Sequence, residues 1–184
     1  MNTESDLSRL KHMGGRHSFI IFVTGDPPPT SRTQSDSVMH TNSSTEIAAP
    51  LDLIYSMTSD LERWPALLPH YRRVRWIEGG PDQGVVEMAA MRGSLPISWT
   101  SEYTRNPELP SLHFRHLSTF TKGMEVRWVY ETCERGVRVT IEHDLDFRWP
   151  LLAPLAEPII SGFMIEWVAP RTLSTFKRLL ERPS

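Results

Sequence analysis

The amino-acid sequence predicts an α+β domain in which a seven-stranded antiparallel sheet wraps around one long C-terminal helix. Seven segments with alternating apolar and polar residues lie between residues 39 and 149, and short turns separate the last six. Two short segments with helical spacing follow the first strand. Residues 158–181 then repeat apolar side chains at helical spacing without a polar loop. Strands joined by short turns favour an antiparallel meander, and one curved face of such a sheet suits the helix.

Residues 1–38 are predicted to be a disordered N-terminal extension, and residues 39–184 to be a single domain. The extension contains three successive prolines and few apolar residues to bury. Its apolar run, residues 19–23, is shorter than the roughly 7–15 residues of a signal-peptide core and the ~20 of a membrane span. A tail with a function of its own is the alternative.

The domain begins with a predicted strand at residues 39–48 and two short helices. The first helix covers residues 51–60 and places several apolar side chains on one face. Asp60 is expected to cap a second helix at residues 61–64, which Pro65 ends.

Six further strands are predicted to follow in succession, each ended by turn residues such as glycine or an Asn-Pro pair. They cover residues 71–78, 84–92, 95–105, 112–120, 123–133 and 137–149.

Alternation along these strands predicts which side chains face the helix, because successive residues of a strand point to opposite faces. The predicted inner face is rich in aromatic residues and methionine, and a few polar groups interrupt it. Such a surface is typical of an apolar cavity with orienting polar groups, and equally of a solid core with amphipathic rims. Its members include Trp99, Ser101, Tyr103, Phe114, His116, Met124, Trp128, Tyr130 and His143.

The last predicted helix has a wide apolar stripe and a proline within it. Pro170 lacks the N–H group that would bond to the carbonyl of Glu166, so the helix is expected to kink or split there. The stripe consists of Ile160, Phe163, Trp167, Leu173, Phe176 and Leu180.

Composition excludes several classes of function. A net charge of -2 and a pI near 6.4 give no basic field for nucleic acid. The single cysteine, Cys133, rules out an internal disulfide and a cysteine-rich zinc site, and favours a cytoplasmic setting. His113 and His116 face opposite ways on a strand, so they do not form a metal pair. The sequence therefore predicts neither a metal ion nor a cofactor.

One basic run lies on the strand that follows the two short helices. Arg72, Arg73 and Arg75 are predicted to form a solvated strand face. A peripheral contact with a membrane or an anionic partner is the alternative, and no integral membrane segment is expected.

Residues 45–78 (TEIAAPLDLIYSMTSDLERWPALLPHYRRVRWIE) resemble the opening of the polyketide cyclase/dehydrase proteins. These proteins are the aromatase/cyclase branch of the START/Bet v1-like (SRPBCC) superfamily. The opening of those proteins has a strand, an "AP" pair before an aliphatic helix, a "WP" corner and an aromatic residue after that corner, and this segment is similar in all four features. The resemblance implies the helix-grip fold, in which the sheet and the C-terminal helix enclose a deep pocket. Weaker similarity continues to about residue 181.

The resemblance also implies where polar groups of the pocket lie. Tyr71 and Ser101 match the family's tyrosine and serine, whereas Tyr103 stands where the family has an arginine, and Arg105 follows on the same strand face. Together with the imidazole of His143, which is able to move protons near pH 7, these give four catalytic candidates: Tyr71, Ser101, Tyr103 and His143. The predicted ligand-pocket residues are Trp64, Trp99, Phe114, His116, Met124, Trp128, Tyr130, Phe163 and Trp167.

Two functions of different class remain open. The first is a cyclase or dehydratase that binds a hydrophobic ring compound and catalyses aldol cyclisation of a polyketide. The second is a non-catalytic carrier of a lipid or isoprenoid quinone, which needs only the apolar pocket and tolerates the missing arginine. An interaction module without a ligand is a third, less favoured interpretation. The sequence predicts no oligomeric state.

Overall fold

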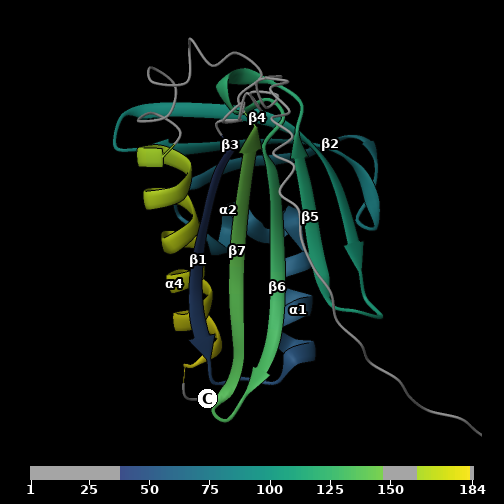
Figure 1. Ribbon diagram of the computed structural model, residues 1–184, viewed down its shortest axis with the longest axis vertical. Helices are drawn as coiled ribbons and strands as arrows, with labels where there is room; N and C mark the ends of the chain where they lie inside the picture. The colour runs from purple at the N-terminus through teal and green to yellow at the C-terminus, as the bar shows by residue number, and fades with distance from the viewer. Residues whose placement is uncertain (1–37, 147–160, 183–184) are drawn as a thin grey trace, which may run out of the picture. The chain divides into compact units, whose positions relative to one another are not determined.

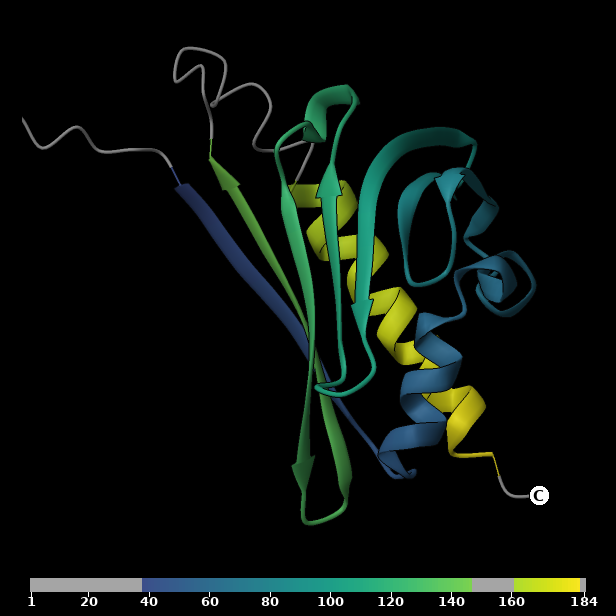
Figure 2. The ribbon, with the colours of Figure 1, turned by 90° about the vertical axis from the view of Figure 1, so that its right-hand side faces the viewer.

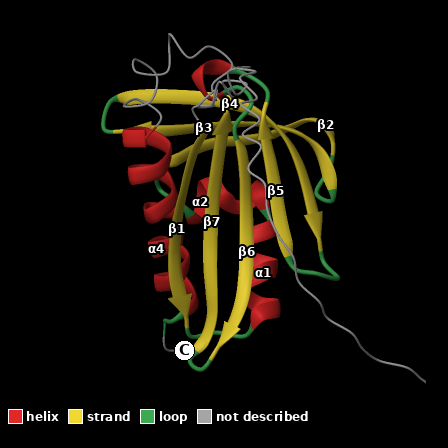
Figure 3. Ribbon diagram, viewed as in Figure 1, coloured by secondary structure: helices red, strands yellow, loops and turns green. Residues whose placement is uncertain are grey.

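The structure is a computed structural model that describes residues 38–146 and 161–182. Seven strands of this part form one antiparallel sheet in the order β1-β7-β6-β5-β4-β3-β2, which confirms the predicted sheet (Figures 1 and 3). All predicted strands are present, with small shifts at most ends. Their bounds are β1 Val38–Ile47, β2 Tyr71–Gly79, β3 Gln83–Arg92, β4 Leu95–Asn106, β5 Ser111–His116, β6 Glu125–Cys133 and β7 Gly136–Asp146.

Two short helical segments connect β1 to β2, as predicted. Helix α1 is Leu51–Ser59, and a 3₁₀ turn η1, Leu61–Arg63, leads into α2, Trp64–Leu67. The expected end of the second helix is wrong, because α2 continues through Pro65, where a first-turn proline loses no helical bond. The expected cap is also wrong: the Asp60 side chain makes no capping bond, and its carbonyl accepts a bond from the Arg63 N–H instead (3.2 Å).

Strand β5 ends at His116 rather than at residue 120, which corrects the sequence prediction. The chain leaves the sheet through a 3₁₀ turn η2, Thr119–Thr121. Thr119 adopts a φ of 64°, a costly conformation for a β-branched residue. The buried Thr121 hydroxyl lies 2.7 Å from Nδ1 of His116, so the turn folds back onto the inner face of the sheet.

The C-terminal helix changes its register near Pro170. Segment η3, Ser161–Val168, has the π-helical pattern, and α4, Ala169–Leu180, is α-helical. Pro170 lies in the first turn of α4, where its missing N–H is tolerated. The backbone stays helical through Val168, so the hydrogen-bond pattern changes next to this proline without a break between the two segments. The parts of the predicted strand and helix at residues 147–149 and 158–160 lie outside the described residues.

The helix lies along the concave face of the sheet (Figure 2). The predicted alternation is confirmed: Trp99, Ser101 and Tyr103 of β4 are buried, whereas their neighbours on the outer face are largely exposed. Trp64 of α2 fills the space between the two layers, with its ring centroid 5.0 Å from that of Tyr71 and 6.1 Å from that of Phe176. The sheet and the helix therefore share one apolar core, the arrangement called helix-grip.

Polar contacts fix both ends of the C-terminal helix. Glu181 accepts a hydrogen bond from the backbone N–H of Ala48 (2.8 Å), and Lys177 donates one to the carbonyl of Glu46 (2.5 Å). At the other end, Arg92 of the β3–β4 hairpin donates to the carbonyl of Gly162 (2.7 Å). The helix is thus attached to β1 at its C-terminal end and to a hairpin at its start.

The basic run of β2 lies on the outer face of the sheet, where Arg73 and Arg75 both pair with Glu87 at 3.0 and 3.2 Å. This geometry agrees with a solvated strand face.

Candidate functional site

A cavity of about 40 Å³ lies between the sheet and the C-terminal helix. Its walls come from α2, from the inner faces of six strands, and from the helix. The lining is mainly aromatic and aliphatic, with four polar side chains. The described lining residues are Trp64, Tyr71, Met88, Trp99, Phe114, His116, Val126, Trp128, Ile141, His143, Val168, Ala169 and Thr172.

Two histidines stand on the sheet wall of the cavity. His116 of β5 stacks on Trp99 with ring centroids 5.9 Å apart, and its Nδ1 is held by Thr121. Burial, with a smaller contribution from the neighbouring His143, lowers the pKa of His116 to about 3. Burial likewise lowers the pKa of His143 to about 4, against a small opposing effect of Asp144. Both imidazoles are therefore neutral at pH 7, the form that accepts a proton.

Several buried polar atoms of the inner face lack a partner within the described part of the chain, and two of them belong to catalytic candidates. His143 is 3% exposed, and its Nδ1 makes no hydrogen bond there. Ser101 is fully buried, and its Oγ is likewise unpaired. Ser101 lies opposite His116 in the register of β4 and β5. Since buried polar groups are normally hydrogen-bonded, the unpaired nitrogen of His143, a residue of the cavity wall, marks a place where a polar ligand atom would be stabilised.

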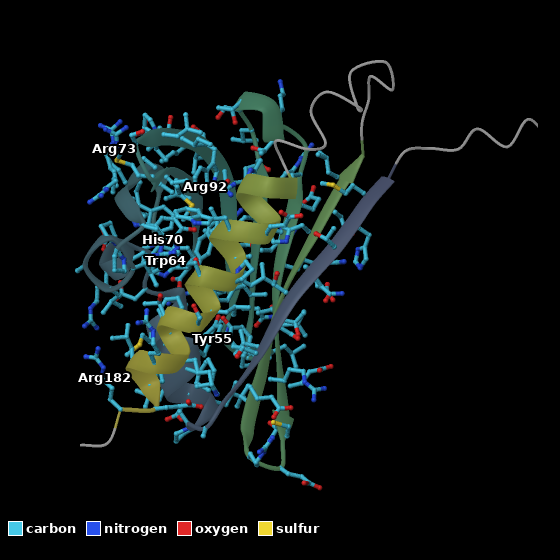
Figure 4. The ribbon with its side chains drawn as sticks, turned by 90° about the vertical axis from the view of Figure 1, so that its left-hand side faces the viewer. Tyr55, Trp64, His70, Arg73, Arg92 and Arg182 are labelled. Carbon is cyan, nitrogen blue, oxygen red and sulfur yellow. The ribbon has the colours of Figure 1, made fainter. Side chains whose placement is uncertain are left out.

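The opposite wall combines the start of β2 with the C-terminal helix. Tyr71 is 5% exposed, and burial raises the pKa of its phenol. Thr172 of α4 is 1% exposed and lies beside it. The Thr172 Oγ1 is 2.9 Å from Nε2 of His70, which comes from the corner between α2 and β2. His70 and Trp64 lie beside the helix in Figure 4.

The structure brings seven of the predicted site residues to the cavity wall. They are the catalytic candidates Tyr71 and His143, and the pocket candidates Trp64, Trp99, Phe114, His116 and Trp128. Their roles in binding or catalysis stay predictions.

Other predicted site residues lie elsewhere in the core or beside it. Tyr130 bonds the hydroxyl of Thr58 (2.8 Å), away from the lining, and Met124 is fully buried without lining the cavity. Trp167 packs edge-on against His70, with ring centroids 5.6 Å apart. Ser101 faces inward but is not among the lining residues, and the Phe163 side chain lies outside what the structure describes.

Neither Tyr103 nor Arg105 supplies a cation to the cavity. The Tyr103 hydroxyl lies 3.4 Å from the Ser59 carbonyl, and its ring packs against Phe114 at 4.9 Å between centroids. Arg105 is held by Asp82, with its Nε and its terminal nitrogen 2.8 and 2.7 Å from the carboxylate. The position where the resemblance implies an arginine is therefore occupied by a neutral side chain of the core.

Sequence reasoning missed part of the lining and the His70 contact. Val126 and Ile141 lie on the inner face that alternation predicts but are not among the predicted pocket residues, and Met88 and Ala169 carry no distinguishing signal. Thr172 lies next to the apolar stripe rather than in it. His70 lies between the predicted helix at residues 61–64 and the predicted strand at 71–78, yet it is 4% exposed because α4 covers the corner.

Two observations bear on other classes of site. Within the described ranges, no three or more histidine, cysteine or acidic side chains are grouped closely enough to hold a metal ion. The helices seen in those ranges are too short or too polar to span a membrane.

Comparison with known proteins identifies the family of this chain. The profile of the family "Polyketide cyclase / dehydrase and lipid transport" matches residues 47–174, which is more than half of the chain. A protein of Streptomyces cyaneus named "Putative polyketide cyclase" is 33% identical over 103 residues, 54% of this chain and 68% of its own. One of Streptomyces halstedii with the same name is 32% identical over 101 residues, 53% of this chain and 93% of its own.

Solved structures with little sequence identity share the fold. The Zhui aromatase/cyclase of Streptomyces sp. R1128 superposes with a TM-score of 0.68 at 19% identity, over 79% of this chain and 94% of its own. The ginseng major latex-like protein 151 from Panax ginseng gives 0.65 at 13% identity, over 79% and 99% of the two chains. The fold is thus that of START/Bet v1-like proteins, and by the match to its profile this chain belongs to the polyketide cyclase/dehydrase and lipid transport family.

Proposed function

We propose that this protein binds an oxygenated, hydrophobic ring compound in the cavity and promotes the aldol cyclisation and dehydration of a polyketide. The observation that carries this proposal is the unpaired Nδ1 of His143, a buried and neutral imidazole on the wall of an aromatic cavity. A hydrocarbon ligand would leave this atom unpaired, whereas a hydroxyl compound or the enol form of a β-ketone brings a hydrogen-bond donor. Family membership supports the same substrate class.

The lining residues suit the steps of ring closure. A methylene between two ketones is acidic, and the neutral imidazole of His143 takes its proton. Burial alone makes His143 a weak base, so the negative enolate that forms beside it must stabilise the imidazolium. The resulting enolate carbon then bonds to a second ketone carbon, whose oxygen receives a hydrogen bond from Tyr71 and becomes a hydroxyl group. Loss of that hydroxyl with a further proton releases one water and leaves a double bond. Neither step needs a metal ion or a redox partner.

The size of the cavity implies that binding opens it. A volume of about 40 Å³ holds roughly three water molecules, since each needs about 10–15 Å³ by this measure. A multi-ring compound is far larger. The C-terminal helix must therefore separate from the sheet, or the rings must rearrange, when the ligand enters.

Binding and turnover test the proposal separately. We expect 1,8-dihydroxyanthraquinone to quench tryptophan fluorescence saturably, because Trp64, Trp99 and Trp128 line the cavity. At about 100 times its Kd the ligand should add about 2.7 kcal/mol to the unfolding free energy. Absence of both effects would overturn the proposal.

For turnover, we expect His143→Gln to slow ring closure of a poly-β-ketone by a factor of roughly 10²–10⁴ while binding is retained. His113→Gln is the matched control, because His113 lies on the outer face of the sheet and pairs with Glu125. Equal turnover in both variants would exclude His143 as the base.

A carrier function is favoured by one observation: the described lining contains no guanidinium to stabilise an enolate. If the protein is a carrier, an isoprenoid quinone should bind more tightly than the anthraquinone. The unmodified protein and the variants should then all lack turnover of a poly-β-ketone.

A further inference from the structure

A strained turn holds one of the two cavity histidines. His116, the last residue of β5, is 3% exposed and lines the cavity, and the chain turns back onto it through η2. Thr121 of this turn is 1% exposed, and its Oγ1 lies 2.7 Å from Nδ1 of His116. Thr119 takes its φ of 64° in the same turn. A costly backbone conformation persists only where the surrounding structure imposes it, and such conformations are common at functional sites.

Backbone hydrogen bonds fix this turn against the histidine. The Gly123 N–H donates to the carbonyl of His116 (2.8 Å), and the Met124 N–H donates to the carbonyl of Thr121 (3.0 Å). The imidazole lies nearly parallel to the Trp99 indole, with 16° between the two ring planes. The ring of His116 is thus held at one nitrogen by Thr121 and on one face by an aromatic neighbour.

The other nitrogen of His116 remains for a ligand. Nδ1 is occupied by Thr121, whereas Nε2 makes no hydrogen bond within the described residues. Burial lowers the pKa of His116 to about 3, so the ring is neutral at pH 7. A neutral imidazole has one donor and one acceptor nitrogen. Nε2 therefore offers the cavity either an N–H group or a lone pair, depending on the tautomer.

Two contact lengths indicate which tautomer is present. The single hydroxyl proton of Thr121 has two neighbours, Nδ1 of His116 at 2.7 Å and Oγ1 of Thr119 at 3.3 Å. Hydroxyl donors form shorter bonds, typically about 2.7–2.8 Å to oxygen, than N–H donors, typically about 2.9–3.0 Å. The proton of Thr121 is therefore assigned to the short contact with Nδ1. The proton of the imidazole then resides on Nε2.

We propose that Thr121 sets the tautomer of His116 so that its Nε2–H donates a hydrogen bond to a carbonyl oxygen of the ligand, the oxygen that carries the enolate charge during ring closure. His116 is then a catalytic residue, whereas Thr121 is a positioning residue because it acts through His116. A neutral N–H donor thereby takes the place of the guanidinium that the described lining lacks. The ligand contact rests on the proposed function, but the tautomer is a property of the protein alone.

The two cavity histidines divide the first step of ring closure between them. Only β6 separates β5 from β7, so the strands that carry His116 and His143 run roughly 10 Å apart. His143 takes a methylene proton, the C–H electron pair forms the double bond of the enolate, and negative charge develops on the adjacent carbonyl oxygen. Nε2–H of His116 stabilises that oxygen and keeps its own proton, so the ring stays neutral throughout.

Nitrogen NMR of protein labelled with ¹⁵N-histidine tests the tautomer without any ligand. We expect the His116 signals of a neutral ring with its proton on Nε2. Thr121→Ser, which keeps the hydroxyl, should preserve that pattern, whereas Thr121→Val, which removes it with little change of shape, should shift the tautomer balance. Thr104→Val, at an exposed position of β4, is the matched control and should leave the signals unchanged. A proton on Nδ1 in the unmodified protein would overturn the inference, whether or not any ligand binds.

The ligand contact is measured with 9,10-anthraquinone and anthracene, which share three fused rings and differ in the two carbonyl groups. We expect the unmodified protein and Thr121→Ser to prefer the quinone, and His116→Phe to lose roughly fivefold of that preference, the worth of about one neutral hydrogen bond. Thr121→Val should lose part of it. His116→Phe combined with Thr121→Val should lose no more than His116→Phe alone, because Thr121 acts through His116.

Turnover gives a second measurement of the same contact. Removing one donor to a developing oxyanion slows a reaction by about 10²–10³. We expect His116→Phe to slow ring closure of a poly-β-ketone by this factor, and Thr121→Ser to retain the rate. Equal weakening of both ring compounds in His116→Phe would mean that His116 only supports packing, and would overturn the contact. If neither compound binds the unmodified protein, the proposed function fails, and the NMR result alone decides the role of Thr121.

Discussion

Three histidines beside the cavity are held neutral by burial, which makes the stability of the domain depend on pH. The pKa values of His70 and His143 fall to about 4 and that of His116 to about 3, from 6.5 without the fold. Between these values and 6.5 the unfolded chain binds more protons, so lower pH favours unfolding. We expect the unfolding free energy, measured with urea, to fall by several kcal/mol from about pH 6.5 to about pH 4.

A variant separates this effect from the titration of carboxylates. Hydrogen bonds to Arg138 and to Lys177 lower the pKa values of Glu46 and Glu181, respectively, from 4.5. These carboxylates therefore bind protons mainly below pH 4.5, whereas the unfolded-state histidines bind protons from about pH 6.5 downward. His143→Gln removes one titrating group and should flatten the slope between about pH 6.5 and about pH 5. If the unfolding free energy of the unmodified protein stays constant across this pH range, the three histidines are not held neutral by the fold.

Tyr103 illustrates how the same residue type serves packing rather than chemistry. Its hydroxyl contacts the Ser59 carbonyl over 3.4 Å, and its ring lies against Trp76 and Phe114. Because this bond is long and the hydroxyl is directed away from the cavity lining, we expect Tyr103→Phe to cost about 1 kcal/mol or less and to leave ligand affinity unchanged. Thermal unfolding and a fluorescence titration measure the two quantities. A loss of turnover with unchanged binding would instead restore Tyr103 as a catalytic acid.

Among the elements, the strands could be predicted because their signal is local. Each strand alternates with a period of two and ends at a turn residue, so the inner face from Trp99 to His143 follows from the sequence. The end of β5 could not be predicted, because Thr119 adopts a left-handed conformation that its residue type disfavours. That turn is stabilised by tertiary contacts, including the one between Thr121 and His116.

Different polar contacts attach the two segments of the C-terminal helix. Arg92 of the β3–β4 hairpin donates to the Gly162 carbonyl in η3, whereas α4 is attached to β1 through Lys177 and Glu181. We expect Arg92→Ala to speed amide exchange in Ser161–Val168 roughly fivefold, the equivalent of about 1 kcal/mol, and to leave Ala169–Leu180 unchanged.

Mass-spectrometric hydrogen exchange gives this comparison directly. Arg75→Ala is the control, since Arg75 is exposed and pairs with Glu87 on the outer face of the sheet. Uniformly faster exchange in both helical segments would mean that Arg92 supports the whole domain rather than the start of the helix.

Across the whole molecule, the fold was easier to predict than the site. The opening motif and the strand pattern indicated helix-grip, and the sheet side of the cavity followed from alternation. The helix side did not, because the change from the π to the α register near Pro170 alters which side chains face the sheet. Val168, Ala169 and Thr172 share one helix face with Leu173 and Phe176, but alanine and threonine there give no apolar signal that would single them out. His70 was missed for a related reason: its burial depends on α4, which is distant in sequence.

The small cavity implies that stability and ligand binding compete in this protein. Ala169 is 3% exposed and lines the cavity from the helix, so Ala169→Leu would add three carbon atoms to the empty volume. Filling a cavity restores lost contacts, and leucine favours a helix, so the melting temperature should hold or rise. The same atoms occupy the space that a ligand must enter, and we expect the affinity for 1,8-dihydroxyanthraquinone to fall by roughly tenfold or more, about 1.4 kcal/mol. Ser174→Leu, at an exposed position of α4, is the matched control and should affect binding little. Undiminished binding in Ala169→Leu would place the ligand outside this cavity, and the proposed site would then be wrong.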